Sequence, residues 1–389
     1  MATVVVFMVV LAGAAAVAAA LRASGCPGAA VLGGVLAGLL LGPGVAGRLA
    51  PEVFERQVVG AVAERAAVMR LRNDVQATMH VADATGGDPS DTLADLRARL
   101  ATAERVMHDA ERTHQAPLRV GVLGIVALVL LAGGALHVEA RTGGAGPIAA
   151  TSIGGWAALL PGGVVMLLAT WWGSDVETAL TAAAAVAIGP WAMTSTDAMI
   201  ADAAERGGAH LVRQAGRVAT LLAVAAIVFA MRASPWALVA LLGIPVGWLV
   251  TRRGGRVTRA LTMGVLLPGL AAMTMLRIEP FLHASFWPIA AVLIVSGDGR
   301  WLGATIGALL PGGRRGWTAM RLGLPLYAAG PMQVAIVALG LWTDRLGGTM
   351  ALALVIGAAA TEVSAGLRRW LSARLDDAEA WSDGDDSEG

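Results

Sequence analysis

Long apolar runs alternate with short polar connections along most of the chain. Each run holds about 20 residues, and a helix of that length crosses the roughly 30 Å hydrocarbon core of a bilayer. The pattern predicts an all-α polytopic membrane protein. The expected spans are residues 3–21, 28–47, 119–138, 148–172, 176–200, 211–231, 235–251, 260–276, 286–310, 322–343 and 348–371.

One long segment, residues 48–118, breaks this alternation because it carries too many charges for hydrocarbon. Its apolar residues recur at helical spacing, and Leu93, Leu96 and Leu100 share one helix face. The stretch "GGDPSD" between its two halves is typical of a turn. We expect an extramembrane α-helical hairpin. The sequence leaves open whether this hairpin is a solvated spacer or a docking surface for a protein partner.

The same pattern divides the chain into four parts. Residues 1–47 hold the first two spans, and residues 48–118 form the hairpin insertion. Residues 119–371 form the main transmembrane bundle. Residues 372–389 are acidic and poor in apolar side chains, so we expect a disordered tail.

Composition supports a membrane protein and excludes several chemistries. Hydrophobic residues make up 56% of the chain and charged residues 15%, against about 25% charged residues in soluble domains. All 29 basic residues are arginines, which excludes chemistry that needs lysine. The single cysteine, Cys26, excludes an internal disulfide. A net charge of +1 gives no reason to expect a nucleic-acid partner. We expect no enzyme activity, no metal site and no cofactor.

The distribution of arginine between the short connections predicts the orientation. If the N-terminus is outside, thirteen arginines fall in inner connections or the tail and three in outer connections. The inner set is Arg22, Arg141, Arg206, Arg252, Arg253, Arg256, Arg259, Arg314, Arg315, Arg321, Arg368, Arg369 and Arg374, and the outer set is Arg232, Arg277 and Arg345. Cytoplasmic loops are enriched in arginine, whereas insertions beyond about 60 residues count little. We therefore expect the plasma (inner) membrane of a bacterium, with the N-terminus and hairpin outside and the C-terminus in the cytoplasm.

Two apolar spans carry polar clusters near their centres. The stretch "AIGPWAMTSTDAM" places Thr194, Ser195, Thr196 and Asp197 after Pro190. Proline removes a backbone donor, and hydroxyl or carboxylate side chains can satisfy backbone groups that an interrupted helix leaves open. The cluster therefore predicts a helix that is interrupted within the membrane.

The second cluster, "SGDGR", contains Asp298 and Arg300 and lies between apolar flanks at residues 291–310. One interrupted span in each half of a chain points to a transporter of inverted repeats whose substrate binds near the midplane, where the two interrupted helices cross. Ionisable residues inside a membrane are functional candidates. The alternative is that these polar residues only cap half-helices or mark a loop.

Several segments resemble one family, in the same order along the chain. Residues 25–49, "GCPGAAVLGGVLAGLLLGPGVAGRL", resemble the second helix of the monovalent cation:proton antiporter superfamily. Residues 124–140, the "TSTD" span and residues 260–370 are similar to later blocks of that family. There Arg300 falls where the family usually has a lysine or arginine. The resemblance implies a sodium/proton antiporter fold, a monovalent cation and a proton as transported ions, and a homodimer in the lipid membrane.

Two departures limit what this resemblance implies. The family's Asp-Asp or Asn-Asp pair is missing, because the aligned positions fall near Arg217 and carry no carboxylate, and a later acid is missing too. One hypothesis is exchange through displaced carboxylates, Asp197 and Asp298, with Arg300 and Arg217 as counter-charges. A second is a transporter of the same fold for an anionic solute. A third is a transport-inactive scaffold or sensor, in which Arg217 pairs permanently with Asp197.

Overall fold

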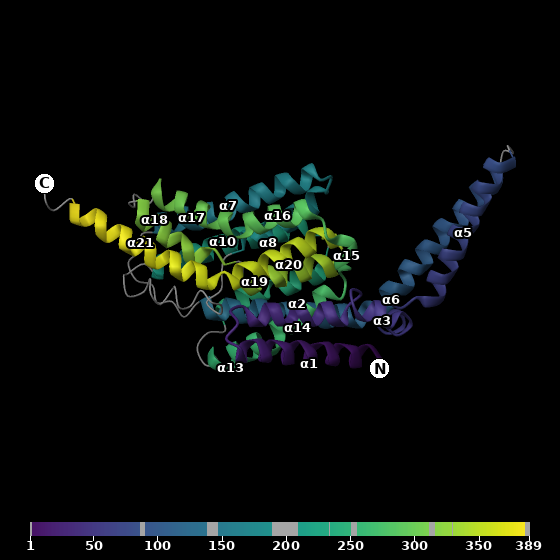
Figure 1. Ribbon diagram of the computed structural model, residues 1–389, viewed down its shortest axis with the longest axis horizontal. Coiled ribbons are helices and arrows are strands. Elements are labelled where there is room, and N and C mark those ends of the chain that lie inside the picture. Colours follow the sequence, from purple (N-terminus) through teal and green to yellow (C-terminus); the bar gives the residue numbers. More distant parts are fainter. Residues whose placement is uncertain are drawn as a thin grey trace. The chain divides into compact units, whose positions relative to one another are not determined.

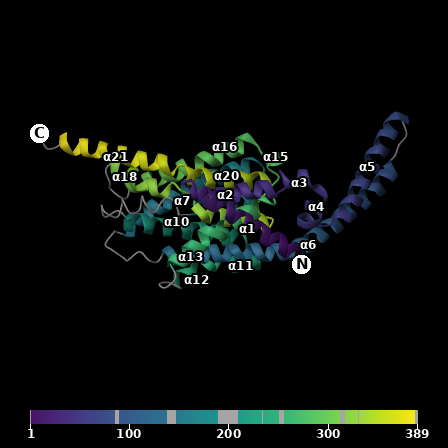
Figure 2. The ribbon, with the colours of Figure 1, turned by 60° about the horizontal axis from the view of Figure 1, so that its bottom comes forward.

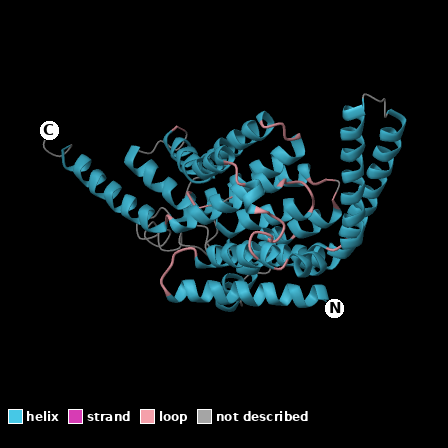
Figure 3. Cartoon of the chain, turned by 45° about the vertical axis from the view of Figure 1, so that its right-hand side comes forward, coloured by secondary structure: helices cyan, strands magenta, loops and turns pink. Residues whose placement is uncertain are grey.

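The structure is a computed structural model that describes residues 2–85, 90–137, 147–188, 209–232, 234–249, 255–310, 316–328 and 330–385. Within these residues every regular element is a helix (Figure 3). Seven helices are long and apolar enough to cross a membrane, and two bent helix pairs raise the number to nine. Two shorter apolar helices lie at residues 176–187 and 237–247. The prediction of an all-α polytopic membrane protein is confirmed.

The chain divides into two compact units, one of Met1–Val9 with Val45–Gly121 and the other of Val10–Gly44 with Val122–Gly389. The helices are α1 (Ala2–Ala23), α2 (Ala29–Leu41), α3 (Ala46–Leu49), α4 (Pro51–Phe54), the π-helix η1 (Glu55–Val59), α5 (Val62–Thr85), α6 (Ser90–His137), α7 (Pro147–Trp171), α8 (Val176–Ala187), α10 (Ala209–Ala230), α11 (Pro235–Leu241), α12 (Gly243–Leu249), α13 (Gly255–Leu261), the π-helix η2 (Thr262–Leu266), α14 (Leu267–Met275), α15 (Pro280–His283), α16 (Phe286–Ile294), the π-helix η3 (Val295–Gly299), α17 (Arg300–Leu309), α18 (Gly316–Gly323), the 3-10 turn η4 (Leu324–Leu326), α19 (Gly330–Trp342), α20 (Gly348–Val363) and α21 (Ala365–Asp385).

The smaller unit contains the hairpin, whose arms are α5 and the first part of α6. Two ion pairs join the arms, from Arg65 to Glu111 at 2.6 Å and from Arg72 to Glu104 at 2.8 Å. The predicted hairpin is therefore present. We expected the second arm to end before the next span. Instead, α6 continues through Pro117 and is 48 residues long. The chain has no polar turn there, and one proline costs a helix a local hydrogen bond without necessarily breaking it.

The larger unit is a bundle in which α7 packs against α8, α10 and α17, and α2 packs against α14 (Figures 1 and 2). Small residues permit these close approaches. A Cβ atom at Gly34 of α2 would lie 2.2 Å from the carbonyl oxygen of Pro268 in α14. In membranes, helices associate through such small residues because lipid supplies no hydrophobic drive between them. Helix α19 is buried along its whole length and packs against α8 and α20.

Two predicted features of the polar segments differ from the structure. Residues 365–385 form helix α21, whereas we expected disorder from residue 372 onward. The first three turns of α21 contain Leu371 and Leu375, and half-buried Leu371 and buried Leu375 pack against Leu324. The second feature is the "SGDGR" cluster, where the chain forms the single π-helical turn η3 within one continuous span, Phe286–Leu309, and does not unwind.

Candidate functional site

Helix α8 ends inside the bundle. Asp175 caps its N-terminus by accepting a 2.8 Å hydrogen bond from the backbone N–H of Thr178, and hydrogen bonds from Thr178 hold the pKa of Asp175 below its usual value. The helix has 12 residues, or about 18 Å, which is shorter than the hydrocarbon core. Ile188 then adopts extended backbone while still fully buried. The last carbonyl groups of α8 therefore face protein interior.

Arg300, the first residue of α17, lies at this helix end. Its side chain is only 1% exposed. Its Nε atom donates to the carbonyl oxygen of Val186, and Nη2 lies 3.5 Å from that of Ala185. Nη1 donates to the carbonyl oxygen of Ala328 at 2.9 Å. The carbonyl end of a helix carries a partial negative charge that a cation stabilises. Arg300 thus neutralises the end of α8 and ties it to the break between η4 and α19.

Asp298 lies two residues before Arg300 but faces a different way. Its side chain is exposed and lies close enough to Tyr327 to interact with it electrostatically. The Tyr327 ring lies against Gly297, where an added Cβ atom would come within 2.3 Å of the ring. The glycine in "SGDG" therefore makes room for the tyrosine. The guanidinium of Arg300 is hydrogen-bonded to backbone carbonyl groups and forms no ion pair with Asp298.

A second buried arginine approaches the same helix break. Arg368 of α21 is 1% exposed, and its Cζ atom lies 5.6 Å from the centroid of the Tyr327 ring. Its Nη2 atom donates to the carbonyl oxygen of Thr361 at 3.1 Å, and it is attracted to Glu362. Glu362 is 2% exposed in the last turn of α20. Buried charges in a membrane protein are costly unless they are paired, so this pair is part of the candidate site.

Glu362 and Arg368 were missed by the sequence reasoning. They lie near the end of an otherwise apolar run, where single charges usually mark the membrane interface. The available signal was the sequence "TEVSAGLRR", in which serine and glycine separate the acid from the base. In the structure the chain bends by 52° between α20 and α21 at this point.

Five predicted site residues remain besides Asp298 and Arg300. Thr194, Ser195, Thr196 and Asp197 fall outside the described residues, a few positions beyond the end of α8. Arg217 lies half-buried on α10, one helical turn from Arg213. In the part of the chain that the structure describes, no three metal-binding side chains come together.

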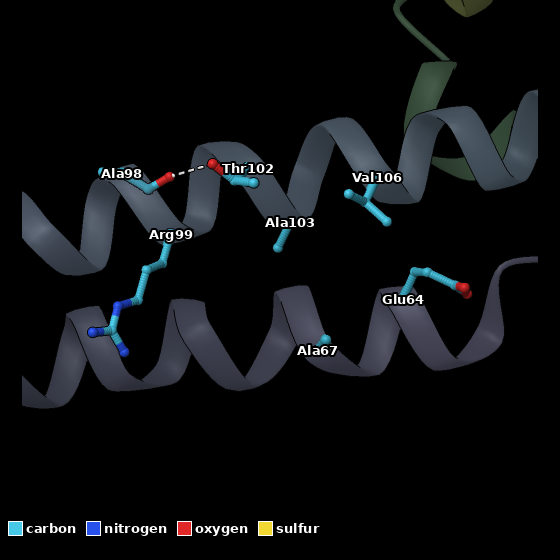
Figure 4. A pocket seen from close by; sticks show the side chains of 7 residues that line it. All are labelled: Glu64, Ala67, Ala98, Arg99, Thr102, Ala103 and Val106. Carbon is cyan, nitrogen blue, oxygen red and sulfur yellow. Dashed lines mark hydrogen bonds between the residues drawn. The ribbon is translucent and has the colours of Figure 1, made fainter.

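The hairpin carries a hollow of a different kind, with a volume of about 470 Å³ (Figure 4). It lies between α5 and α6, and its lining includes Ala67, Ala98, Ala103 and Val106. Glu64 and Arg99 are its only charged lining residues. The small, mostly apolar lining fits a helix-packing surface better than a site for a polar ligand.

Comparison of the chain with protein-family models, curated proteins and solved structures finds no match.

Proposed function

We propose that the protein is a secondary transporter that exchanges a monovalent cation for protons, built on the fold of the cation:proton antiporters. The observation that carries this proposal is the end of α8 within the buried core, with the guanidinium of Arg300 on its last carbonyl groups. Transporters of inverted repeats use half-helix ends of this kind to form an ion site near the midplane. The "TSTD" residues follow the end of α8 by a few positions in the chain, and on sequence grounds they are candidates for such a site.

Asp298 is the candidate ion-binding acid for which the described residues offer the most support. Cation and proton exchange requires one carboxylate that binds either ion in turn. Asp298 is exposed on the bundle, lies on the π-helical turn next to Arg300, and lies near Tyr327. π-Helical turns inside α-helices are frequent at functional sites. Asp197 remains the second candidate acid on sequence grounds.

The orientation of the transporter is also a proposal, and contacts within the bundle support it. Arg277 donates to the carbonyl oxygen of Leu341 at 2.9 Å, and Arg345 pairs with Glu177, so the connections near these residues meet at one end. Gly44 lies against Pro280 at the same end. This is the arginine-poor end, and the chain passes from it into the hairpin unit. The positive-inside rule places it outside the membrane.

A transport-inactive scaffold is the second candidate, and the hydrogen bonds of Arg300 favour it. All three go to backbone carbonyls, so the residue joins α8 to the η4–α19 break without requiring a transported ion. A buried cation held in this way can fix a conformation without adding much stability.

Flux through purified protein in liposomes separates the two functions. The vesicles enclose a pH-sensitive dye, and sodium, potassium or lithium is added against a preset proton gradient. We expect cation-dependent proton flux from the wild type and loss of that flux in Asp298→Asn. The matched control is Asp95→Asn, which removes an exposed acid of the hairpin. Equal flux in both variants would remove Asp298 from the mechanism, and no flux from the wild type would favour the scaffold.

A further inference from the structure

A buried acid, Glu362, and a buried base, Arg368, flank the bend between α20 and α21. Glu362 lies in the last turn of α20 and Arg368 in the first turn of α21, so each belongs to a different helix. Ser364 between them leaves the helical backbone, with φ −68° and ψ 3°. Rotation at this one residue would change the separation of the two charges and leave both helices intact. Hinges of this kind absorb a conformational change in a few residues.

Arg368 has partners other than Glu362. It donates to the carbonyl oxygen of Thr361 at the end of α20, and its guanidinium lies over the Tyr327 ring. A cation over an aromatic ring is stabilised by the ring's electron-rich face. The guanidinium can therefore move away from the carboxylate of Glu362 and still keep favourable contacts. Other charged or titratable groups near it are Asp298, which contacts Tyr327, and Arg369.

Glu362 is also contacted by the beginning of α2. A Cβ atom at Gly28 would lie 2.7 Å from the Cβ atom of Glu362, and Gly28 has a φ of +71° that side chains rarely adopt. Glycine thus lets the backbone at the N-terminus of α2 approach the acid closely. The positive end of the α2 dipole there favours a negative charge. Glu362 therefore has a favourable setting for its carboxylate that does not depend on Arg368.

From these contacts we propose that Glu362 is a cation-binding acid and that Arg368 is its resident counter-charge. In one state Arg368 neutralises the carboxylate. In the other, α21 turns at Ser364, Arg368 leaves the end of α20 but stays over the Tyr327 ring, and a monovalent cation takes its place beside Glu362. This inference rests on the proposed transport function, for which it supplies a site at the arginine-rich end of the bundle.

The test removes the resident cation and asks whether an added one replaces it. The full chain is purified as Arg368→Gln, and its melting temperature is measured in sodium or potassium chloride and in the bulky N-methylglucamine salt. We expect sodium or potassium to raise the melting temperature by about 5 °C, as a ligand well above its dissociation constant would. The double variant with Glu362→Gln should lose this response. The control, Arg369→Gln, removes an exposed neighbouring charge and should behave as the wild type.

An Arg368→Gln protein without a cation response, or a response that survives in the double variant, would overturn the assignment. If Arg368→Gln is not recovered folded, Arg368→Lys replaces it, with a smaller cation response that must again disappear with Glu362→Gln. These measurements need no transport. A wild type without flux but an Arg368→Gln variant with a cation response would therefore reject the proposed function and keep the binding site.

Discussion

Replacing Arg300 by methionine tests what the buried guanidinium does for the bundle. Methionine keeps much of the side-chain volume but leaves the carbonyl oxygens of Val186 and Ala328 without their donor. Each buried carbonyl oxygen that loses its partner lowers the free energy of unfolding by about 1–3 kcal/mol, so the loss at both oxygens amounts to about 2–6 kcal/mol. Relief of the desolvation of the buried guanidinium offsets part of this loss. We expect a net loss of about 2–4 kcal/mol in the free energy of unfolding.

Thermal unfolding of the detergent-solubilised protein, followed by tryptophan fluorescence, measures this loss. For a chain of 389 residues, a change of that size lowers the melting temperature by roughly 2–5 °C. Arg300→Lys keeps the charge but not the planar fork of donors, so it should recover only part of the loss. The control is Arg369→Met on exposed α21 surface, where we expect a change within about 0.5 kcal/mol. If Arg300→Met melts together with that control, the guanidinium does not hold the end of α8.

Three further predictions test helix packing, membrane topology and the role of Asp197. Gly154→Ala should destabilise the α7–α10 contact, because the new Cβ atom would lie 2.1 Å from the carbonyl oxygen of Ala215. The control, Gly155→Ala, places its Cβ atom where nothing lies within 4 Å and should be neutral or stabilising. Equal melting temperatures of the two variants would contradict the close approach at Gly154. With Cys26 replaced by serine, a single cysteine at residues 86–89 should react with an impermeant thiol reagent on intact cells, and labelling only after lysis would reverse the orientation. Asp197→Asn should abolish cation-dependent proton flux in liposomes while the protein stays folded, and wild-type flux in this variant would place the proton site elsewhere.

Much of the architecture follows from hydrophobic pattern alone. The apolar runs and the charged hairpin are visible in the sequence because a bilayer restricts which residues a span can carry. The importance of Arg300 was also predictable, since a charge between apolar flanks needs a partner. A half-helix end was an expected partner, but the carbonyl group of Ala328 was not, because it carries no side-chain signal.

The helix breaks show where sequence reasoning fails. The "SGDG" stretch has the composition of an interruption, yet the chain continues through it as a π-helical turn. Whether this stretch interrupts the helix depends on packing, because the Tyr327 ring lies against Gly297, which has no side chain. Conversely, the bend at Ser364 lies in a segment that reads as one apolar helix. Residues 372–385, for which we expected disorder, belong to α21, whose Leu375 packs against Leu324.

The central claim is that this bundle exchanges monovalent cations for protons. The most direct measurement is proton flux by purified wild-type protein in liposomes, driven by a sodium, potassium or lithium gradient at fixed membrane potential. We expect at least one of these cations to drive protons in the opposite direction, at a rate that depends on the amount of protein, and we expect no such flux in empty vesicles. Protein that is folded by its thermal transition, and yet moves no protons with any of the three cations, would contradict it.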